Sequence, residues 1–210
     1  MLQILIVLFG LSLLWVSITN MLGTVIKILV LQGLILFGIT LLKTNEINWL
    51  GFSVIALETI IFKAILIPWF IDDTIKHNRI RREVEARVSN FFSLALMSLI
   101  FILSFALSAS APIWAIKVFP LEFGIAFATI LKGMFIIIAN KKLITHLMGY
   151  LIMENGIFLL SLSAGSHLPY VVSLGVSLDI MLSVLIAVLF IKRIRSTFDD
   201  AQSPQLLKEK

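Results

Sequence analysis

The feature that most constrains this chain is a series of seven apolar segments, each about 20 residues long and nearly free of charge. The segments cover residues 2–18, 24–42, 49–71, 90–111, 120–139, 145–164 and 170–191. An α-helix needs about 20 apolar residues to cross the hydrocarbon core of a bilayer. The sequence therefore predicts an all-α, polytopic membrane helix bundle of about seven transmembrane helices, which forms a single integral membrane domain over residues 1–210.

The composition excludes the common soluble classes. Of the 210 residues, 60% are hydrophobic and 14% are charged, whereas a soluble domain carries about 25% charged residues. The chain has too few polar groups to cover the surface of a soluble enzyme or a nucleic-acid-binding domain, so we expect the lipid bilayer, and no nucleic acid, as a partner. The sequence has no cysteine and contains no metal-ligand triad, nucleophile elbow or phosphate-binding loop. We therefore expect no catalytic residues, no bound metal and no cofactor in this chain.

The basic residues predict the orientation of the segments. Lys and Arg gather in the loop 72–89, in the turn after residue 139 and in the tail that follows residue 191, whereas the opposite loops hold only Lys43 and Lys117. Because cytoplasmic loops are enriched in Lys and Arg, the N-terminus is predicted outside and the C-terminus, with the tail 196–210, in the cytoplasm. The loop 72–89 is interpreted as a solvated helix extension or, alternatively, as a docking surface for a cytoplasmic partner.

Five ionisable residues lie near the middle of these segments: Glu58, Lys63, Lys132, Glu154 and Asp179. Each costs roughly 2.5–3.5 kcal/mol at the bilayer centre on insertion scales, and such groups usually mark an ion or proton path. We therefore predict a proton or ion relay in which the acids are protonatable stations and the lysines tune or relay charge. Glu58 and Lys63 are separated by about 140° around one helix, so any ion pair must join two helices. The alternative is that such a pair only locks helices together.

Three further residues are candidates for the relay. His146, Tyr150 and Glu154 recur at a spacing of four and therefore share one stripe of a helix, which favours a short proton wire from the cytoplasmic side. Alternatively, Tyr150 only satisfies Glu154, and His146 lies at the interface. Glu122, near the outer end of its segment, is either a further relay residue or a first-turn acid at a helix N-terminus.

The third and seventh segments resemble each other. Residues 51–58 and 172–179 each end on an acid, and each segment ends shortly before charged residues. This likeness suggests that residues 1–71 form a degenerate copy of the last three segments. Parallel repeats of this kind occur in transporters.

The C-terminal half also carries a set of short motifs in a fixed order. They are Lys141-Lys142-Leu143-Ile144, Leu147-Met148-Gly149 and Met153-Glu154-Asn155, followed by Asp179 in the next segment. With this set, residues 120–195 resemble the three-span K-type subunit of respiratory complex I, and Asp179 stands where that family has its second glutamate. The first family glutamate would fall on Leu151, one turn before Glu154, so its role is carried over to Glu154 only with a shift of one turn.

A seven-segment chain with a K-like C-terminal half resembles component E of hydrogenase-4 and related membrane-bound hydrogenases. The resemblance implies a non-catalytic membrane-arm subunit in a bacterial or archaeal plasma membrane. Its partners would be antiporter-like membrane subunits, a membrane anchor subunit and a peripheral cytoplasmic hydrogenase module, and those partner subunits would hold the nickel–iron and iron–sulfur centres. The subunit would couple electron transfer to proton or sodium translocation, in a hydrogenase, formate-linked or cation-antiporter complex. A purely structural spacer and a stand-alone small-cation transporter are the alternatives.

Overall fold

The computed structural model describes residues 1–43, 60, 63, 65, 67–77, 89–110 and 120–163. The elements with described bounds are all α-helices, and the sequence predicts an all-α chain. They are α1 (Leu2–Ile18), α2 (Leu22–Lys43), α4 (Ile67–His77), α5 (Asn90–Ser110), α6 (Pro120–Ala139) and α7 (Leu143–Ser163). Of these, α2, α5, α6 and α7 are long and apolar enough to cross a membrane, and α1 is equally apolar but shorter, with 17 residues. These helices are compatible with a membrane bundle, whereas the number of seven spans and their orientation remain predictions.

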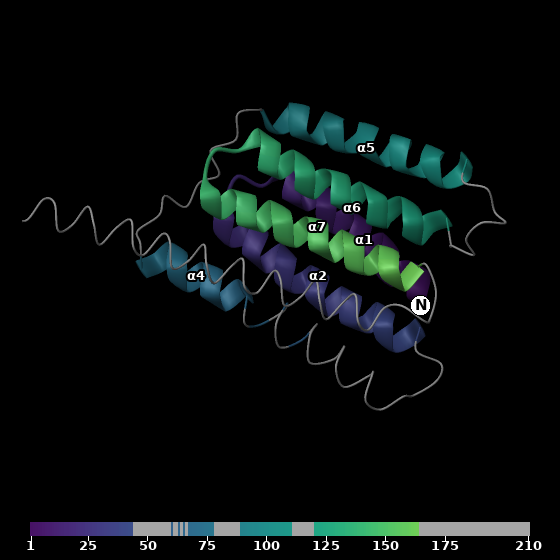
Figure 1. The fold of residues 1–210 in the computed structure, drawn as a ribbon, viewed down its shortest axis with the longest axis horizontal. Helices are drawn as coiled ribbons and strands as arrows, with labels where there is room; N and C mark the ends of the chain where they lie inside the picture. The colour runs from purple at the N-terminus through teal and green to yellow at the C-terminus, as the bar shows by residue number, and fades with distance from the viewer. Residues whose placement is uncertain are drawn as a thin grey trace, which may run out of the picture.

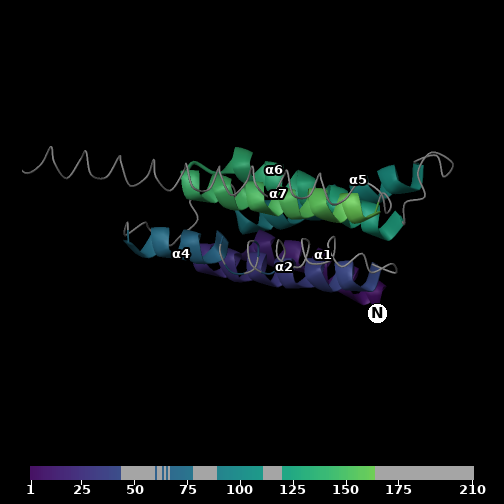
Figure 2. The same cartoon turned by 60° about the horizontal axis from the view of Figure 1, so that its bottom comes forward.

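The helices lie with their axes nearly aligned in two layers. In Figures 1 and 2, α1, α2 and α4 form one layer, and α5, α6 and α7 form the other. The apolar core lies between the layers and includes the fully buried side chains of Phe9, Leu13, Leu36 and Ile152. Large apolar side chains on α5, among them Phe91, are exposed on the outer face of the bundle. Such a face is suited to contact with lipid, where no polar cover is needed.

The helix ends follow local sequence signals. Ser89 precedes α5, and its hydroxyl accepts a hydrogen bond from the backbone N–H of Phe92 at 3.3 Å, which is an N-cap. Pro120 is the first residue of α6, where its fixed φ suits the helix and its missing N–H is not needed. Short turns join α1 to α2 and α6 to α7, so consecutive helices in each pair run antiparallel.

One predicted boundary differs from the structure. The third apolar segment was expected to end at residue 71, with a loop from 72, but α4 continues to His77. Asp72 and Lys76 are one turn apart in this extension and form an ion pair at 2.5 Å, which is a favourable i, i+4 arrangement. Residues 72–77 are thus the solvated helix extension that was one of the two interpretations of this loop. The rest of the loop, 78–88, most of the third segment and the whole of the seventh segment lie outside the described residues.

Glycines allow α6 and α7 to pack in close contact. A Cβ atom built on Gly133 would lie 2.5 Å from the carbonyl oxygen of Gly149 and 2.6 Å from the backbone nitrogen of Met153. A Cβ on Gly156 would lie 2.9 Å from the carbonyl oxygen of Ala126. Small residues let backbones approach in this way in membrane helix pairs. This contact fixes the rotation of α7, which carries Glu154 into the interior.

Candidate functional site

The centre of the candidate site is a buried ion pair between Lys63 and Glu154. Each side chain is only 4% exposed. Glu154 lies on α7, and Lys63 lies in π-helical backbone shortly before α4, a local geometry that is frequent at functional sites. The Lys63 ammonium also lies 4.2 Å from the centre of the Phe158 ring. Since Glu154 and Phe158 are one turn apart on α7, one helix face supplies both an anion and an aromatic face to the same cation.

The surroundings of this pair are largely apolar. A cavity of about 10 Å³ adjoins it, with Leu29, Pro68 and Leu151 among its lining residues. This volume is close to the minimum of about 10–15 Å³ that one water molecule requires. Among the described residues the two charges face each other with little space for water beside them, and breaking such a buried pair is costly.

A chain of buried hydrogen bonds begins beside the ion pair, at Asn155. Its side-chain amide donates to the Gln32 carbonyl oxygen at 3.1 Å, and the Gln32 amide donates to the Ser12 hydroxyl at 2.8 Å. Ser12 in turn donates to the backbone oxygen of Phe9 at 2.6 Å. The chain crosses from α7 through α2 to α1, and its three side chains are at most 3% exposed. It ties the two layers together next to Glu154.

These polar residues were missed or underrated at the level of sequence. The sequence patterns above give no role to Gln32 or Ser12, and Asn155 appears there only as part of the motif around Glu154. The available signal was the presence of two amide side chains in long apolar segments. A buried amide needs partners for both its donor and its acceptor, so two of them in one bundle favour a direct hydrogen bond.

The polar contacts of Lys132 are separate from those of the Lys63–Glu154 pair. The Lys132 side chain is 1% exposed, and its ammonium donates to the Ser93 hydroxyl of α5 at 3.1 Å and lies 5.2 Å from the centre of the Phe135 ring. No carboxylate in the described part of the chain lies within ion-pair distance of it. The structure thus brings together two of the five predicted midplane residues, Lys63 and Glu154, and gives Lys132 a separate environment. The other two, Glu58 and Asp179, lie outside the described residues.

The predicted stripe of His146, Tyr150 and Glu154 lies on α7 without a hydrogen-bonded connection. His146 Nε2 is 2.9 Å from the backbone oxygen of Asn140, across the turn from α6. Between these three described side chains there is no direct hydrogen bond, so a proton wire along the stripe would require intervening water. The alternative in which Tyr150 satisfies Glu154 is also not what is seen, because Lys63 holds that carboxylate.

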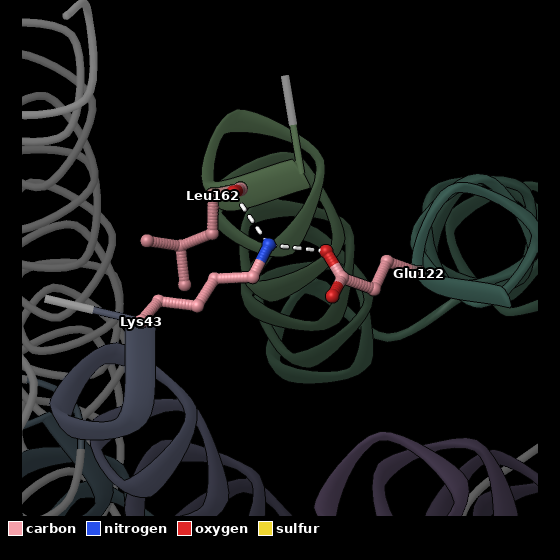
Figure 3. A network of polar contacts seen from close by, with 3 residues as sticks. All are labelled: Lys43, Glu122 and Leu162. Carbon is pink, nitrogen blue, oxygen red and sulfur yellow. Dashed lines mark hydrogen bonds and ion pairs between the residues drawn. The ribbon is translucent and has the colours of Figure 1, made fainter. Parts of the chain in front are cut away.

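Glu122 has a clear structural setting at the far end of the bundle. It lies in the first turn of α6, is 2% exposed, and forms an ion pair with Lys43 from the last turn of α2. Figure 3 shows that the Lys43 ammonium also donates to the backbone oxygen of Leu162 near the end of α7, at 2.7 Å. The acid at a helix N-terminus and the cation at a helix C-terminus each match the helix dipole. This network ties α2, α6 and α7 together.

Within the described ranges, no group of three or more His, Cys, Asp or Glu side chains could hold a metal ion. The polar groups that the structure places at the site are the Lys63 ammonium, the Glu154 carboxylate and the side-chain amide of Asn155.

Comparison with known proteins gives one relative. The chain is 24% identical over 193 residues to an uncharacterised protein, Rv0085, of Mycobacterium tuberculosis, and the alignment covers 88% of this chain and 84% of that protein. No protein-family model matches the chain. No solved structure matches it. The likeness extends over most of both chains.

Proposed function

We propose that this chain is a non-catalytic membrane-arm subunit of a hydrogenase or complex-I-like complex, and that it couples electron transfer to proton or sodium translocation. The relay would use Glu58, Glu154 and Asp179 as protonatable stations, with Lys63 and Lys132 adjusting or passing charge. Electron transfer would occur in partner subunits that hold the metal centres. The assignment to component E of hydrogenase-4 is part of this proposal and derives from the sequence motifs.

The observation that carries the proposal is the ion pair between Lys63 and Glu154. A bundle of apolar helices gains little stability from a buried ion pair, because desolvation offsets much of the attraction. Buried ionisable groups inside membrane helices are costly and usually serve transport. The motif comparison reaches Glu154 with a shift of one turn from the family position at Leu151, so the sequence supports the same residue as the contact geometry once that shift is allowed.

A purely architectural role is the second candidate, and specific contacts favour it. The Lys43–Glu122 ion pair and the glycine contacts between α6 and α7 both hold helices together. A structural spacer would use the Lys63–Glu154 pair in the same manner. If the pair is part of a relay, loss of its charge should stop ion pumping by the assembled complex. If the pair only holds helices together, a complex that still assembles should pump normally.

The test compares Glu154→Gln with Glu122→Gln in inverted membrane vesicles. Both substitutions remove the charge of a buried acid that is paired with a lysine. The sequence left Glu122 as a possible relay residue, but this proposal assigns it to the helix-end network with Lys43 and makes only Glu154 a station of the relay. The amount of assembled complex is measured by pull-down in mild detergent, and ion pumping is measured by dye quenching and divided by that amount. The relay predicts that Glu154→Gln abolishes pumping per complex and Glu122→Gln preserves it. Normal pumping in the Glu154→Gln complex would overturn the relay.

The pull-down also separates a membrane-arm subunit from a stand-alone transporter. A membrane-arm subunit is expected to co-purify with large antiporter-like membrane proteins and with a nickel–iron hydrogenase module. Recovery of the tagged chain alone, under conditions that leave other membrane complexes intact, would favour a stand-alone small-cation transporter and contradict the proposal.

A further inference from the structure

A second cavity is lined by Lys132, away from the Lys63–Glu154 pair. Its volume is about 50 Å³, several times the 10–15 Å³ that one water molecule needs. The cavity lies where α1 and α6 end and where α2, α5 and α7 begin. Its polar lining includes Lys132, Ser93, Asn140 and Thr145, and no acidic side chain is among the described residues that line it.

Two side-chain oxygen atoms of this lining are buried without a hydrogen-bond partner. They are the hydroxyl oxygen of Thr145, a residue that is 3% exposed, and the side-chain amide oxygen (Oδ1) of Asn140, a residue that is 7% exposed. Buried polar atoms are nearly always satisfied in native proteins, by protein groups or by bound molecules. The cavity is therefore built to hold something polar.

The charge around the cavity favours an anion. A buried ammonium needs a counter-charge, and Lys132 has only a hydroxyl and an aromatic ring as partners among the described residues. Helix N-termini of α5 and α7 adjoin the cavity and attract negative charge. Two carbonyl groups near the opposing helix ends already accept hydrogen bonds: the backbone oxygen of Ile18 from Asn90, and that of Ile136 from Asn140. The Thr145 hydroxyl is a buried donor of the lining without a hydrogen-bond partner, so it is available to a ligand.

We propose that this cavity is a binding site for one small monovalent anion of the size of chloride, held by the Lys132 ammonium and the Thr145 hydroxyl. The side-chain amide oxygen of Asn140 is an acceptor, so it takes a water molecule that shares the cavity with the anion. Bound here, the anion neutralises Lys132 in the interior. The site lies at the bundle end formed by the turns α1–α2 and α6–α7, which the charge distribution predicts to be cytoplasmic, so the anion enters from that side.

The test measures the ³⁵Cl NMR line width of sodium chloride in the presence of the purified full chain in non-ionic detergent. Ionic strength is kept constant with sodium gluconate, so that only chloride occupancy changes. The wild type is expected to give an excess line width that saturates with chloride. Lys132→Met should abolish the saturable part. Lys27→Met, the same substitution at an exposed lysine of α2, is the matched control and should retain it.

A second variant keeps the test decisive if Lys132→Met does not fold. Thr145→Val preserves shape and removes only the hydroxyl, and it should weaken chloride binding about tenfold or more, because a hydrogen bond to a charged group is lost. Absence of saturable broadening in the wild type, or equal broadening in Thr145→Val and wild type, would overturn the proposal and leave a water-filled cavity. The readout is binding by the isolated chain, so its failure is distinct from a failure of ion pumping by a complex.

Discussion

Breaking the Lys63–Glu154 pair from one side should destabilise the bundle strongly. Lys63→Met leaves the Glu154 carboxylate, which is 4% exposed, without its cation. Removal of one partner from a buried ion pair typically costs about 3–5 kcal/mol, because the remaining charge is uncompensated. Insertion scales place a single charge at the bilayer centre at roughly 2.5–3.5 kcal/mol. We therefore expect a loss of about 3 kcal/mol in the free energy of unfolding.

Removing both charges should restore most of that loss. In the double variant Lys63→Met, Glu154→Met neither side chain needs a counter-ion, and apolar replacements of similar volume for a buried pair are often neutral or stabilising. The double variant is expected within about 1 kcal/mol of the wild type. The adjoining cavity is only about 10 Å³, so little empty space should remain around the two methionine side chains, and little stability should be lost on that account.

The measurement is unfolding of the purified chain in mixed micelles by increasing detergent denaturant, followed by far-ultraviolet circular dichroism. A double-mutant cycle of the two single variants and the double variant isolates the coupling between the two side chains. Single variants that each cost less than about 1 kcal/mol, the range of an exposed pair, would refute the reasoning that the pair is dry. So would a double variant whose loss equals the sum of the two single losses.

Three other substitutions test the packing and the hydrogen bonds in the same unfolding assay. Gly133→Ala should lower the free energy of unfolding by about 1–3 kcal/mol, because the added Cβ meets backbone atoms of α7. Gly23→Ala, where an added Cβ has nothing within 4 Å, should leave that free energy unchanged or raise it by up to about 1 kcal/mol. Equal effects of the two substitutions would contradict the close helix contact. Gln32→Leu should cost about 1–3 kcal/mol, because the buried Asn155 amide loses its acceptor and the Ser12 hydroxyl keeps only its bond to the Phe9 oxygen. Gln3→Leu, at an exposed position of α1, should cost nothing measurable, and a neutral Gln32→Leu would speak against the hydrogen-bond chain. Lys43→Met should cost about 3 kcal/mol by leaving a buried carboxylate unpaired, and a loss that disappears at high salt would indicate a solvated pair instead.

Much of the helical architecture is predictable from the sequence because membrane-like helices leave a strong signal. Continuous apolar runs predict the type of element, and polar turns predict where it ends, so α1 and α6 begin and end at the expected residues. Hydropathy marks the end of the apolar run at residue 71, whereas the helix itself continues to His77, with an ion pair between Asp72 and Lys76 in the extension.

The contacts of the candidate site are harder to predict, since they depend on which helices are neighbours and on how each is rotated. The separation of Glu58 and Lys63 around a helix correctly requires an interhelical pair for Lys63, but it does not name Glu154 as the partner. Lys132 lies at a similar predicted depth, yet it faces Ser93 on α5. Gln32 becomes important only because the rotation of α7 brings Asn155 within hydrogen-bond distance.

The most direct test of the proposed relay is ion pumping by the complex that contains the double variant Lys63→Met, Glu154→Met. This variant removes the charges and is expected to keep the packing, so the complex should assemble. In inverted vesicles, we predict that electron transfer to or from hydrogen continues while ion pumping per assembled complex is lost. If the double variant pumps as many ions per electron transferred as the wild type, the relay is contradicted, and the Lys63–Glu154 pair has only a structural role.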